Sequence, residues 1–331
     1  MKEYLLTILK LSQPSLLEFL VKELNKLGIK TKSNGKWIYH KGTYPVMLVA
    51  HLDTVHRILP TDETIFYSKD GNILNCVNGI GGDDRCGVAI IMELIKRTKL
   101  DFSILFTTDE EIGAVGAGNF VQTHSKLRNV NAIVEYDRRG STDVVRYYDT
   151  NLKLTEIVEK YGFARNIGSF SDIVDLSEAY GVSSVNISSG YFNEHSHYET
   201  IDINVMEDVI NKSISMFTNE SFEEKIIFES MYKYGGVYSS GTTYLEDSFG
   251  GYWKFDPKLK KFVQVGNKKN EPKTISKVSH IEEKGCYYCD SYIGVAYYKG
   301  YGYLCADCAE ELGLIDEDEY YGLYYDYPKG Y

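Results

Sequence analysis

Short apolar runs alternate with longer amphipathic stretches through the first two thirds of the chain. The short runs are typical of strands buried on both faces of a sheet; they read VMLVA at 46–50, FSILF at 102–106, AIVEY at 132–136 and VSSVNI at 182–187. The longer stretches have helical spacing and cover 12–28, 84–98, 151–161, 172–180 and 203–217. This alternation predicts an α/β domain over residues 1–217, with a mixed, mostly parallel central sheet flanked by helices.

The pattern changes after residue 217. Residues 218–280 are rich in glycine and tyrosine with short aromatic alternations, which predict small antiparallel hairpins and a linker. Residues 281–314 carry four cysteines, and residues 315–331 form an acidic, tyrosine-rich tail to which we assign no fold. We therefore expect a small β-rich module after the main domain.

Composition and charge narrow the class of protein. With 43% hydrophobic and 25% charged residues among 331, the chain has a globular composition, and no apolar run approaches the roughly 20 residues of a membrane helix. The first residues, MKEYLLTILKLSQ, mix charged and apolar side chains unlike a secretory signal, so we expect a cytoplasmic protein. The net charge of −11 argues against a nucleic-acid binder.

Acidic and imidazole side chains follow all four predicted strands. In chain order they are His51, then Asp83 and Asp84 in a glycine-rich turn, Glu110 and Glu111, Asp137, and finally His195 and Glu199. Ligands of open α/β sheets bind at the carboxyl ends of the strands, where these side chains would converge. Their like charges would repel one another without a cation. Imidazole mixed with carboxylate favours zinc, with cobalt or manganese as alternatives.

Five motifs over residues 1–217 resemble a known family. In order they read HLDTV, GGDDRCG, TTDEEIGAVGAG, EYDRRG and HSHYE. They are similar to the metal-site motifs of the dinuclear-zinc exopeptidases, a group that includes peptidase T, bacterial zinc aminopeptidases and glutamyl-type aminopeptidases. Each motif alone is weak, but five in this order form a specific signal.

The resemblance implies a role for each matched residue. Two catalytic zinc ions would share Asp83, with His51 and Asp137 completing one site and Glu111 and His195 the other. Asp53 would accept a hydrogen bond from the ring of His51 and fix its tautomer. Glu110 would be the general base that takes a proton from a metal-bound water.

The implied activity is hydrolysis of an amide bond in small peptides, most simply by an aminopeptidase. An N-acyl amino-acid deacylase, a dipeptidase and a carboxypeptidase share this metal chemistry and stay open. A non-catalytic scaffold that docks a protein partner through the cysteine module is an alternative of another class, but Glu110 beside a full ligand set favours the enzyme. Asp137 and His195 are 58 positions apart, too close for an inserted lid domain.

Six further residues lie close to these motifs. We expect His56 and His197 at the solvent or substrate rim, and Asp84 as a support for its turn. Asp172 could face the cleft or serve as a carboxylate at a helix N-terminus. Arg138 and Arg139 could hold a substrate carboxylate or a surface acid.

Four cysteines form a second candidate site. CYYC and CADC are two C-x2-C pairs separated by fifteen residues, a spacing typical of structural zinc; they supply Cys286, Cys289, Cys305 and Cys308. Iron is the alternative metal, whereas disulfides do not suit a chain expected in the cytoplasm. One structural zinc ion would then act as a staple or support a protein-docking surface, because the surroundings are tyrosine-rich and acidic.

Overall fold

The computed structural model of the chain describes residues 1–168 and 170–230, together with the backbone of short strands between residues 237 and 304. The chain divides into two compact units, Met1–Tyr234 and Gly235–Tyr331. Cys286, Cys289, Cys305 and Cys308 lie outside the described residues. The four-cysteine module therefore stays a prediction, as do the segment boundaries after residue 217.

Seven helices and twelve strands make up the described part of the first unit. The helices are α1 Lys2–Leu9, α2 Gln13–Lys26, α3 Gly82–Thr98, α4 Val115–Thr123, α5 Lys153–Glu159, α6 Asp172–Tyr180 and α7 Ile203–Asn219. The main-sheet strands are β1 Lys32–Ser33, β2 Trp37–His40, β3 Tyr44–His51, β6 Phe102–Thr107, β7 Ala132–Arg138, β8 Asp143–Val145, β9 Ala164–Asn166 and β10 Ser184–Ser188. A smaller sheet contains β4 Ile65–Tyr67, β5 Ile73–Cys76, β11 Tyr191–Phe192 and β12 Thr200–Asp202.

The main sheet has the order β1-β2-β6-β3-β7-β10-β8-β9. Its four central strands, β6, β3, β7 and β10, are parallel, whereas β2 and β8 run antiparallel beside them. The chain leaves β3 for β6 on one side and later enters β7 on the other side. The strand order thus reverses around β3, and the crevice at its carboxyl end is the expected ligand position. The predicted mixed, mostly parallel sheet with flanking helices is confirmed.

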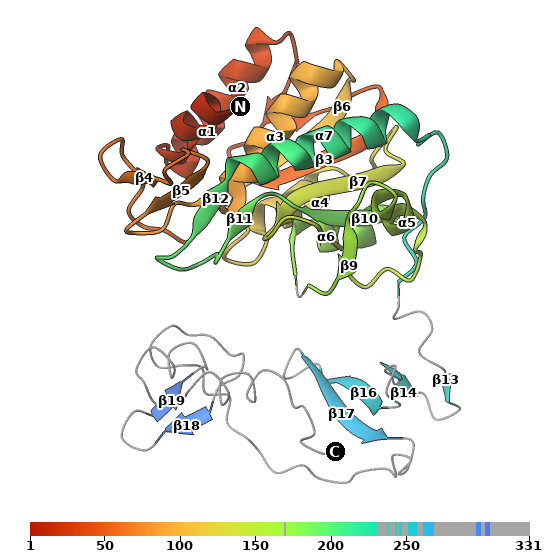
Figure 1. The fold of residues 1–331 in the computed structure, drawn as a ribbon. Coiled ribbons are helices and arrows are strands. Elements are labelled where there is room, and N and C mark those ends of the chain that lie inside the picture. Colours follow the sequence, from red (N-terminus) through yellow and green to blue (C-terminus); the bar gives the residue numbers. More distant parts are fainter. Residues whose placement is uncertain are drawn as a thin grey trace. The chain divides into compact units, whose positions relative to one another are not determined.

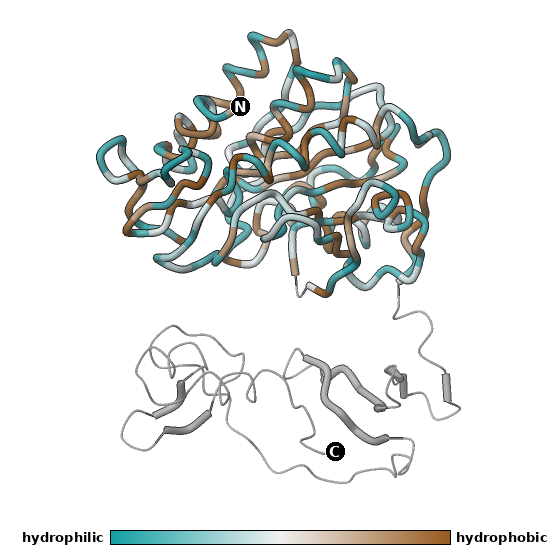
Figure 2. The backbone as a smooth tube through the Cα atoms, viewed as in Figure 1, coloured by the Kyte–Doolittle hydropathy of each residue, from teal (hydrophilic) through white to brown (hydrophobic). Residues whose placement is uncertain are grey.

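Two helical layers cover the sheet because its central strands are apolar on both faces. Val46, Leu48 and Ala50 of β3 pack with α1, α2, α3 and α7, while Met47 and Val49 pack against α4 and α6. Figure 1 shows these layers on opposite sides of the sheet. In Figure 2 brown and teal segments alternate along α7, as expected for a helix with one buried face, whereas α3 is buried all round from Gly82 to Ile95. This packing fixes the strand ends that carry the polar side chains.

The helix predicted over 12–28 matches α2, whose first turn is capped by the hydroxyl of Ser12 on the backbone N–H of Ser15. The other four predicted helices and the four predicted strands are likewise present. Helices α1 and α4 were not predicted. The sequence of α4, VGAGNFVQT, contains two glycines and three β-branched residues, which give it low helix propensity. Its position is set by packing of Phe120 and Ala117.

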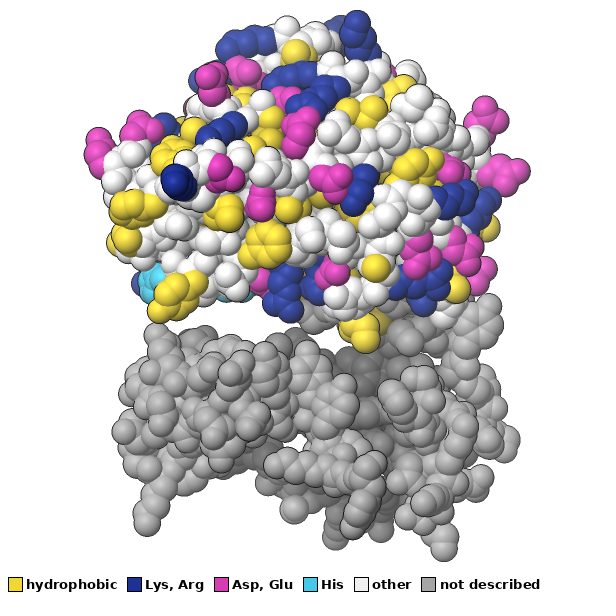
Figure 3. All heavy atoms as spheres, viewed as in Figure 1, with side chains coloured by type: hydrophobic (Ala, Val, Ile, Leu, Met, Phe, Trp, Pro, Cys, Tyr) yellow, Lys and Arg dark blue, Asp and Glu magenta, His cyan; other side chains and the backbone are white. Residues whose placement is uncertain are grey.

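The second unit contains antiparallel strand pairs. They are β13 Val237–Tyr238 with β14 Thr242–Thr243, β15 Leu245–Glu246 with β16 Gly251–Asp256, β16 with β17 Lys261–Asn267, and β18 Ala296–Tyr298 with β19 Gly302–Leu304. Across the described residues of both units, every helix is too short or too polar to cross a bilayer. On the face of the first unit drawn in Figure 3, basic and acidic side chains are interspersed.

Candidate metal centre

Side chains from five separate segments meet at the carboxyl ends of β3, β6 and β7. His51 is the last residue of β3, and Glu110 and Glu111 lie in the loop after β6. Asp137 lies near the end of β7, Asp83 near the start of α3, and His195 in the loop between β11 and β12. Ends of parallel strands share one edge of the sheet, so the topology brings together residues that are up to 144 positions apart.

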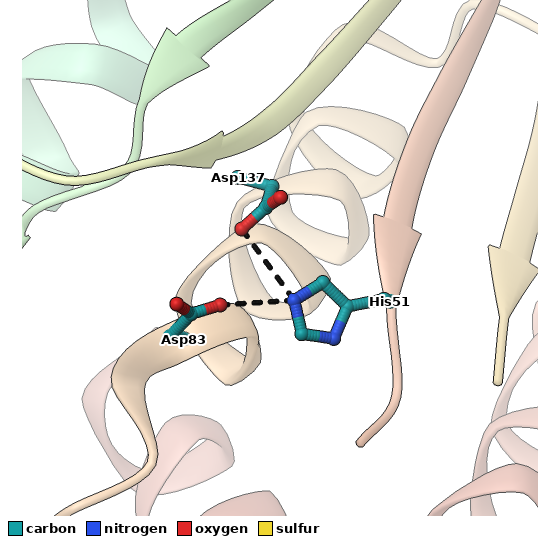
Figure 4. Close-up of side chains that lie close together, drawn as sticks. All are labelled: His51, Asp83 and Asp137. Atoms are coloured by element: carbon teal, nitrogen blue, oxygen red, sulfur yellow. Dashed lines mark hydrogen bonds and ion pairs between the residues drawn. The ribbon is translucent and has the colours of Figure 1, made fainter. Parts of the chain in front are cut away.

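His51 is the centre of a first cluster. Its Nε2 atom lies 2.9 Å from Oδ1 of Asp83 and 3.5 Å from Oδ1 of Asp137. Figure 4 shows the ring extending from β3 toward these two carboxylates. The other ring atom, Nδ1, lies 3.1 Å from Oδ1 of Asp53. A proton held on Nδ1 by Asp53 leaves the lone pair of Nε2 directed at the cluster, which is the arrangement of a metal-binding histidine.

His195 forms a second cluster with the same aspartate. Its Nε2 atom lies 3.2 Å from Oδ2 of Asp83 and 3.0 Å from Oε2 of Glu111. The two carboxylate oxygens of Asp83 therefore face two different histidines. Ligand-capable atoms lie within 4.8 Å of one another in each of these clusters and in a third group, His51 with Glu110 and Glu111. Asp83 is thus placed between two potential cation positions.

Asp53 fixes the acidic loop as well as the histidine. Its two oxygens accept the backbone N–H groups of Glu110 and Glu111, both at 3.0 Å. The preceding residue, Asp109, has φ of +59° and is tied to Lys36 at 2.7 Å and to the side chain of Gln13 at 2.8 Å. Aspartate tolerates this left-handed conformation better than most residues do. The loop therefore presents Glu110 and Glu111 to the cluster from a held backbone.

The charges of the site are unbalanced without a cation. Burial, together with the charges of Asp137 and Asp172, raises the pKa of Glu110 to about 9. Burial and the neighbouring charge of Asp83 raise the pKa of Asp137 to about 7. Carboxyl groups that resist ionisation at neutral pH mark a cavity in which positive charge is missing. The donor set, two imidazoles with carboxylates on a shared aspartate, fits divalent metal ions of the zinc type.

The pKa values of the two histidines also indicate that a cation fits this site. Burial lowers the pKa of His51, but the charge of Asp137 and hydrogen bonds to the acids outweigh it and raise the pKa well above its usual value. Hydrogen bonds to Asp83 and Glu111 raise the pKa of His195 to about 11. In both cases the acids favour a cation at the imidazole Nε2 atom. A proton supplies that charge in part, and a divalent ion would supply it in full.

Glu199 holds the turn that carries Asp83, a role that the sequence did not reveal. Its buried carboxylate accepts the backbone N–H of Gly81 at 2.8 Å and of Asp83 at 3.0 Å. Nε2 of His56 lies 2.5 Å from the same carboxylate. The prediction that His56 lies at the solvent or substrate rim is wrong, because its side chain is 8% exposed and paired with Glu199.

Other buried polar residues support the first cluster. Arg85 is 1% exposed and donates to the backbone carbonyls of Asp53 and Leu11, at 2.7 and 3.1 Å. Asn186 of β10 accepts the N–H of Asp137 at 2.9 Å, and the hydroxyl of Tyr191 donates to Oδ1 of Asp137 at 3.2 Å. These residues were not predicted, because an isolated arginine, asparagine or tyrosine carries no spacing signal.

The other residues close to the motifs lie around the two clusters. Asp84 is buried and accepts the N–H groups of Gly87 at 3.0 Å and His51 at 3.3 Å, so it supports the turn. Asp172 is buried and accepts a hydrogen bond from Thr107. Arg138 and Arg139 pair with protein acids, Asp143 at 3.4 Å and Glu194 at 2.6 Å. His197 is exposed.

A cavity of about 150 Å³ opens at the metal centre. Its walls include the carboxylates of both clusters and His195, together with Tyr147, Phe170, Tyr191, Glu194 and the two arginines, whereas His51 lies buried behind them. Most of the lining is polar and much of it is acidic. A small group with a positive charge would be attracted to this cavity.

Comparison with known proteins agrees with this geometry. Residues 35–198 match the family model of peptidase family M28. This segment contains all five strand-end motifs apart from the last residue of HSHYE, and the match supports a metal-dependent peptidase and hence a hydrolase. No curated protein matches the chain significantly.

Solved structures share the fold. A tripeptidase from Staphylococcus aureus is 12% identical, with a TM-score of 0.53 over 65% of this chain and 96% of its own. Aminopeptidase PepT from Bacillus cereus is 12% identical, with a TM-score of 0.52 over 66% and 98%. A glutaminyl cyclase from Tannerella forsythia is 16% identical, with a TM-score of 0.50 over 66% and 97%. At such identities the likeness establishes the architecture only.

Proposed function

We propose that the protein is a dinuclear zinc aminopeptidase that removes the N-terminal residue of small peptides. The observation that carries the proposal is Asp83, whose two oxygens face His51 and His195 in separate clusters at one cavity. The match of residues 35–198 to peptidase family M28 supports the reaction class. Cobalt and manganese are alternative metals for the same ligands.

Five residues would hold the two ions. They are Asp83 between both, His51 and Asp137 on one side, and Glu111 and His195 on the other. The bound ions would supply positive charge that polarises the scissile carbonyl and lowers the pKa of water. Asp53 would keep the proton of His51 on Nδ1 and so keep Nε2 free for coordination.

Glu110 would be the general base. It lies beside Glu111 in the loop held by Asp53. One of its carboxylate oxygens lies within 4.8 Å of a ring nitrogen of His51. Its carboxylate would accept a proton from the attacking water and later return it to the leaving amine. Burial and the neighbouring acids raise the pKa of Glu110 while no cation is present, and two bound divalent ions would lower it, so that the carboxylate could accept the proton near neutral pH.

The acidic cavity favours an aminopeptidase over the other exopeptidases. Glu194 and the acids of the centre surround a space of about 150 Å³, suited to one small residue with a protonated amine. Once two bound ions offset the charges of their ligands, the walls of this space offer a substrate carboxylate no free arginine, because Arg138 and Arg139 are paired with Asp143 and Glu194.

The test compares matched peptides with the full chain supplied with zinc or cobalt. Mass spectrometry should show loss of the N-terminal residue from a free peptide and no reaction of its N-acetylated form. Release of the acyl group would instead identify a deacylase, and loss of the C-terminal residue a carboxypeptidase. Cyclisation of an N-terminal glutamine without peptide cleavage, as the name of the cyclase neighbour suggests for that protein, would also contradict the proposal.

Two finer parts of the proposal rest on the sequence alone. They are one structural zinc ion on the four cysteines of residues 281–314, with a partner-docking or stapling role, and a cytoplasmic location.

If no peptide or N-acyl substrate were turned over by the metal-loaded chain, the scaffold alternative would replace the enzyme.

A further inference from the structure

The described part of the chain contains a second cavity, of about 590 Å³, besides the one at the metal centre. The two share Tyr147 as a wall. The hydroxyl of Tyr147 accepts a hydrogen bond from Asn186 at 3.2 Å, and Asn186 also holds the backbone of Asp137. The larger cavity lies among β8, β9 and α5, and its volume is within the range of pockets that bind small ligands. Neither the family match nor the metal chemistry assigns it a role.

The polar groups of this cavity leave one cation unpaired. Among the described residues, half-buried Arg146 makes no hydrogen bond or ion pair, whereas the other arginine of the lining, Arg165, pairs with Glu159 at 2.6 Å. Asp149, the acid of the lining, accepts bonds from Ser183 at 2.6 Å and from the backbone of Asn151 at 2.9 Å. Among the described residues, Asp149 forms no direct ion pair with Arg146.

A buried hydroxyl in the same lining also lacks a partner. Thr155 of α5 is 1% exposed, and its Oγ1 atom makes no hydrogen bond. Threonine in a helix commonly bonds a carbonyl of the preceding turn, but here it does not. A buried hydroxyl without a partner costs free energy, and a ligand oxygen would recover it once a small shift of the lining opened Oγ1 to the cavity. The remaining walls include the apolar side chains Val144 and Ile167.

From these features we infer that the second cavity binds the C-terminal residue of a short peptide substrate, with the terminal carboxylate at Arg146 and Thr155. A free guanidinium and an unpaired hydroxyl suit a carboxylate, and the apolar walls suit an uncharged side chain. The peptide would pass Tyr147, with its N-terminal residue at the metal centre. This inference rests on the proposed aminopeptidase function and adds a substrate class, short peptides with a free, apolar C-terminal residue.

The test uses three peptides with the full chain: Ala-Ala-Leu, its C-terminal amide, and Ala-Ala-Glu-amide. A charge-assisted contact of about 1.5–3 kcal/mol corresponds to a preference of roughly 10- to 100-fold in kcat/KM for the free acid over the leucine amide. Arg146→Ala should abolish that preference mainly through KM, while Arg146→Lys should retain part of it. Arg128→Ala, which removes an exposed arginine outside the cavity, should leave it unchanged. Thr155→Val should reduce it severalfold.

Calorimetric binding separates this inference from the proposed function. In a Glu110→Gln background, Ala-Ala-Leu should bind at least about tenfold more tightly than its amide, and adding Arg146→Ala should remove the difference. This result would support the cavity assignment even if the chain hydrolysed no peptide. Equal binding of acid and amide, or a preference that survives Arg146→Ala, would overturn it. Tighter binding of Ala-Ala-Glu-amide than of Ala-Ala-Leu would overturn the assignment to the chain terminus.

Discussion

Glu110 differs from the other carboxylates of the centre in combining a pKa raised to about 9 with a backbone held by Asp53. We expect Glu110→Gln to lower turnover by at least about 100-fold, because the amide cannot accept a proton. The metal content should stay at the parent value, since the proposed ligands are untouched. Steady-state kinetics and elemental analysis check both parts, with Glu178→Gln, at an exposed position of α6, as the control. Activity within a few-fold of the parent would assign the base to another residue.

Asp172 gives a stability prediction that depends on pH. Burial raises its pKa from the ordinary 3.8 to about 7. The folded chain therefore binds this proton more tightly than the unfolded chain, so its stability falls as pH rises from about 4 to about 7. Asparagine can still accept the hydrogen bond of Thr107. Because it cannot ionise, the variant should not lose stability in this way as the pH rises.

The free energy of unfolding of Asp172→Asn, relative to that of the parent, should therefore increase from pH 4 to pH 8. The increase should be up to on the order of 4 kcal/mol. Urea unfolding at both pH values checks this, with exposed Asp208→Asn as the control. Identical pH dependence of the parent and Asp172→Asn would show that Asp172 is ionised in the folded chain.

Among single residues, the sequence allowed prediction of those that belong to motifs. His51, Asp83 and Glu111 each lie in a recognisable motif close to a strand end, and the structure brings them together. His56 and Glu199 were not predicted as a pair because they are 143 positions apart and neither lies in a regular spacing. Their contact depends on β12 returning beside β5 in the smaller sheet, which no local pattern predicts.

The turn before α3 is the element on which the centre depends most. Glu199 accepts two of its backbone N–H groups, from Gly81 and Asp83, in a fully buried position. We expect Glu199→Ala to weaken metal binding about 10- to 100-fold, because Asp83 would lose the support that orients it. Glu199→Gln should retain part of the affinity, since its amide oxygen can still accept one bond.

Competition with a chromogenic chelator measures this affinity without relying on activity. Glu194→Gln, which alters a cavity acid outside the proposed ligand set, is the matched control. Unchanged metal affinity in Glu199→Ala, with the fold intact by circular dichroism, would show that the turn holds its shape without Glu199.

Elements differ in how far the sequence determines them. Strands β3, β6, β7 and β10 are buried on both faces, so their apolar runs are unambiguous. The short outer strands, such as β9 with its exposed residues 164–166, have no such signal and form by pairing with β8. Helix α4 is placed by tertiary packing against the sheet in spite of its glycines.

At the scale of the molecule, the first unit extends beyond the last predicted helix. Phe222 and Ile226 are each 2% exposed and pack in the main core. Two isolated apolar residues after a helix form no periodic pattern, so the predicted domain did not include them. The cysteine module, in contrast, is predicted strongly by the spacing of its cysteines, but these residues lie outside the described part of the chain.

The two proposed metal sites are chemically separate. The open site of imidazoles and carboxylates should exchange its ions with chelators, whereas four thiolates should hold theirs more tightly. The full chain should then carry about three ions, and a Cys286→Ser, Cys289→Ser variant about two. That variant should keep its peptidase activity where it stays folded.

The central claim is that Asp83 is shared by two ions, and metal content by elemental analysis of Asp83→Ala tests it most directly. In the cysteine-substituted background the parent should hold about two ions, Asp83→Ala almost none, and Glu111→Ala about one. Both oxygens of Asp83 face a histidine, so their removal should open both positions together. One ion retained at full occupancy in folded Asp83→Ala would contradict the shared aspartate.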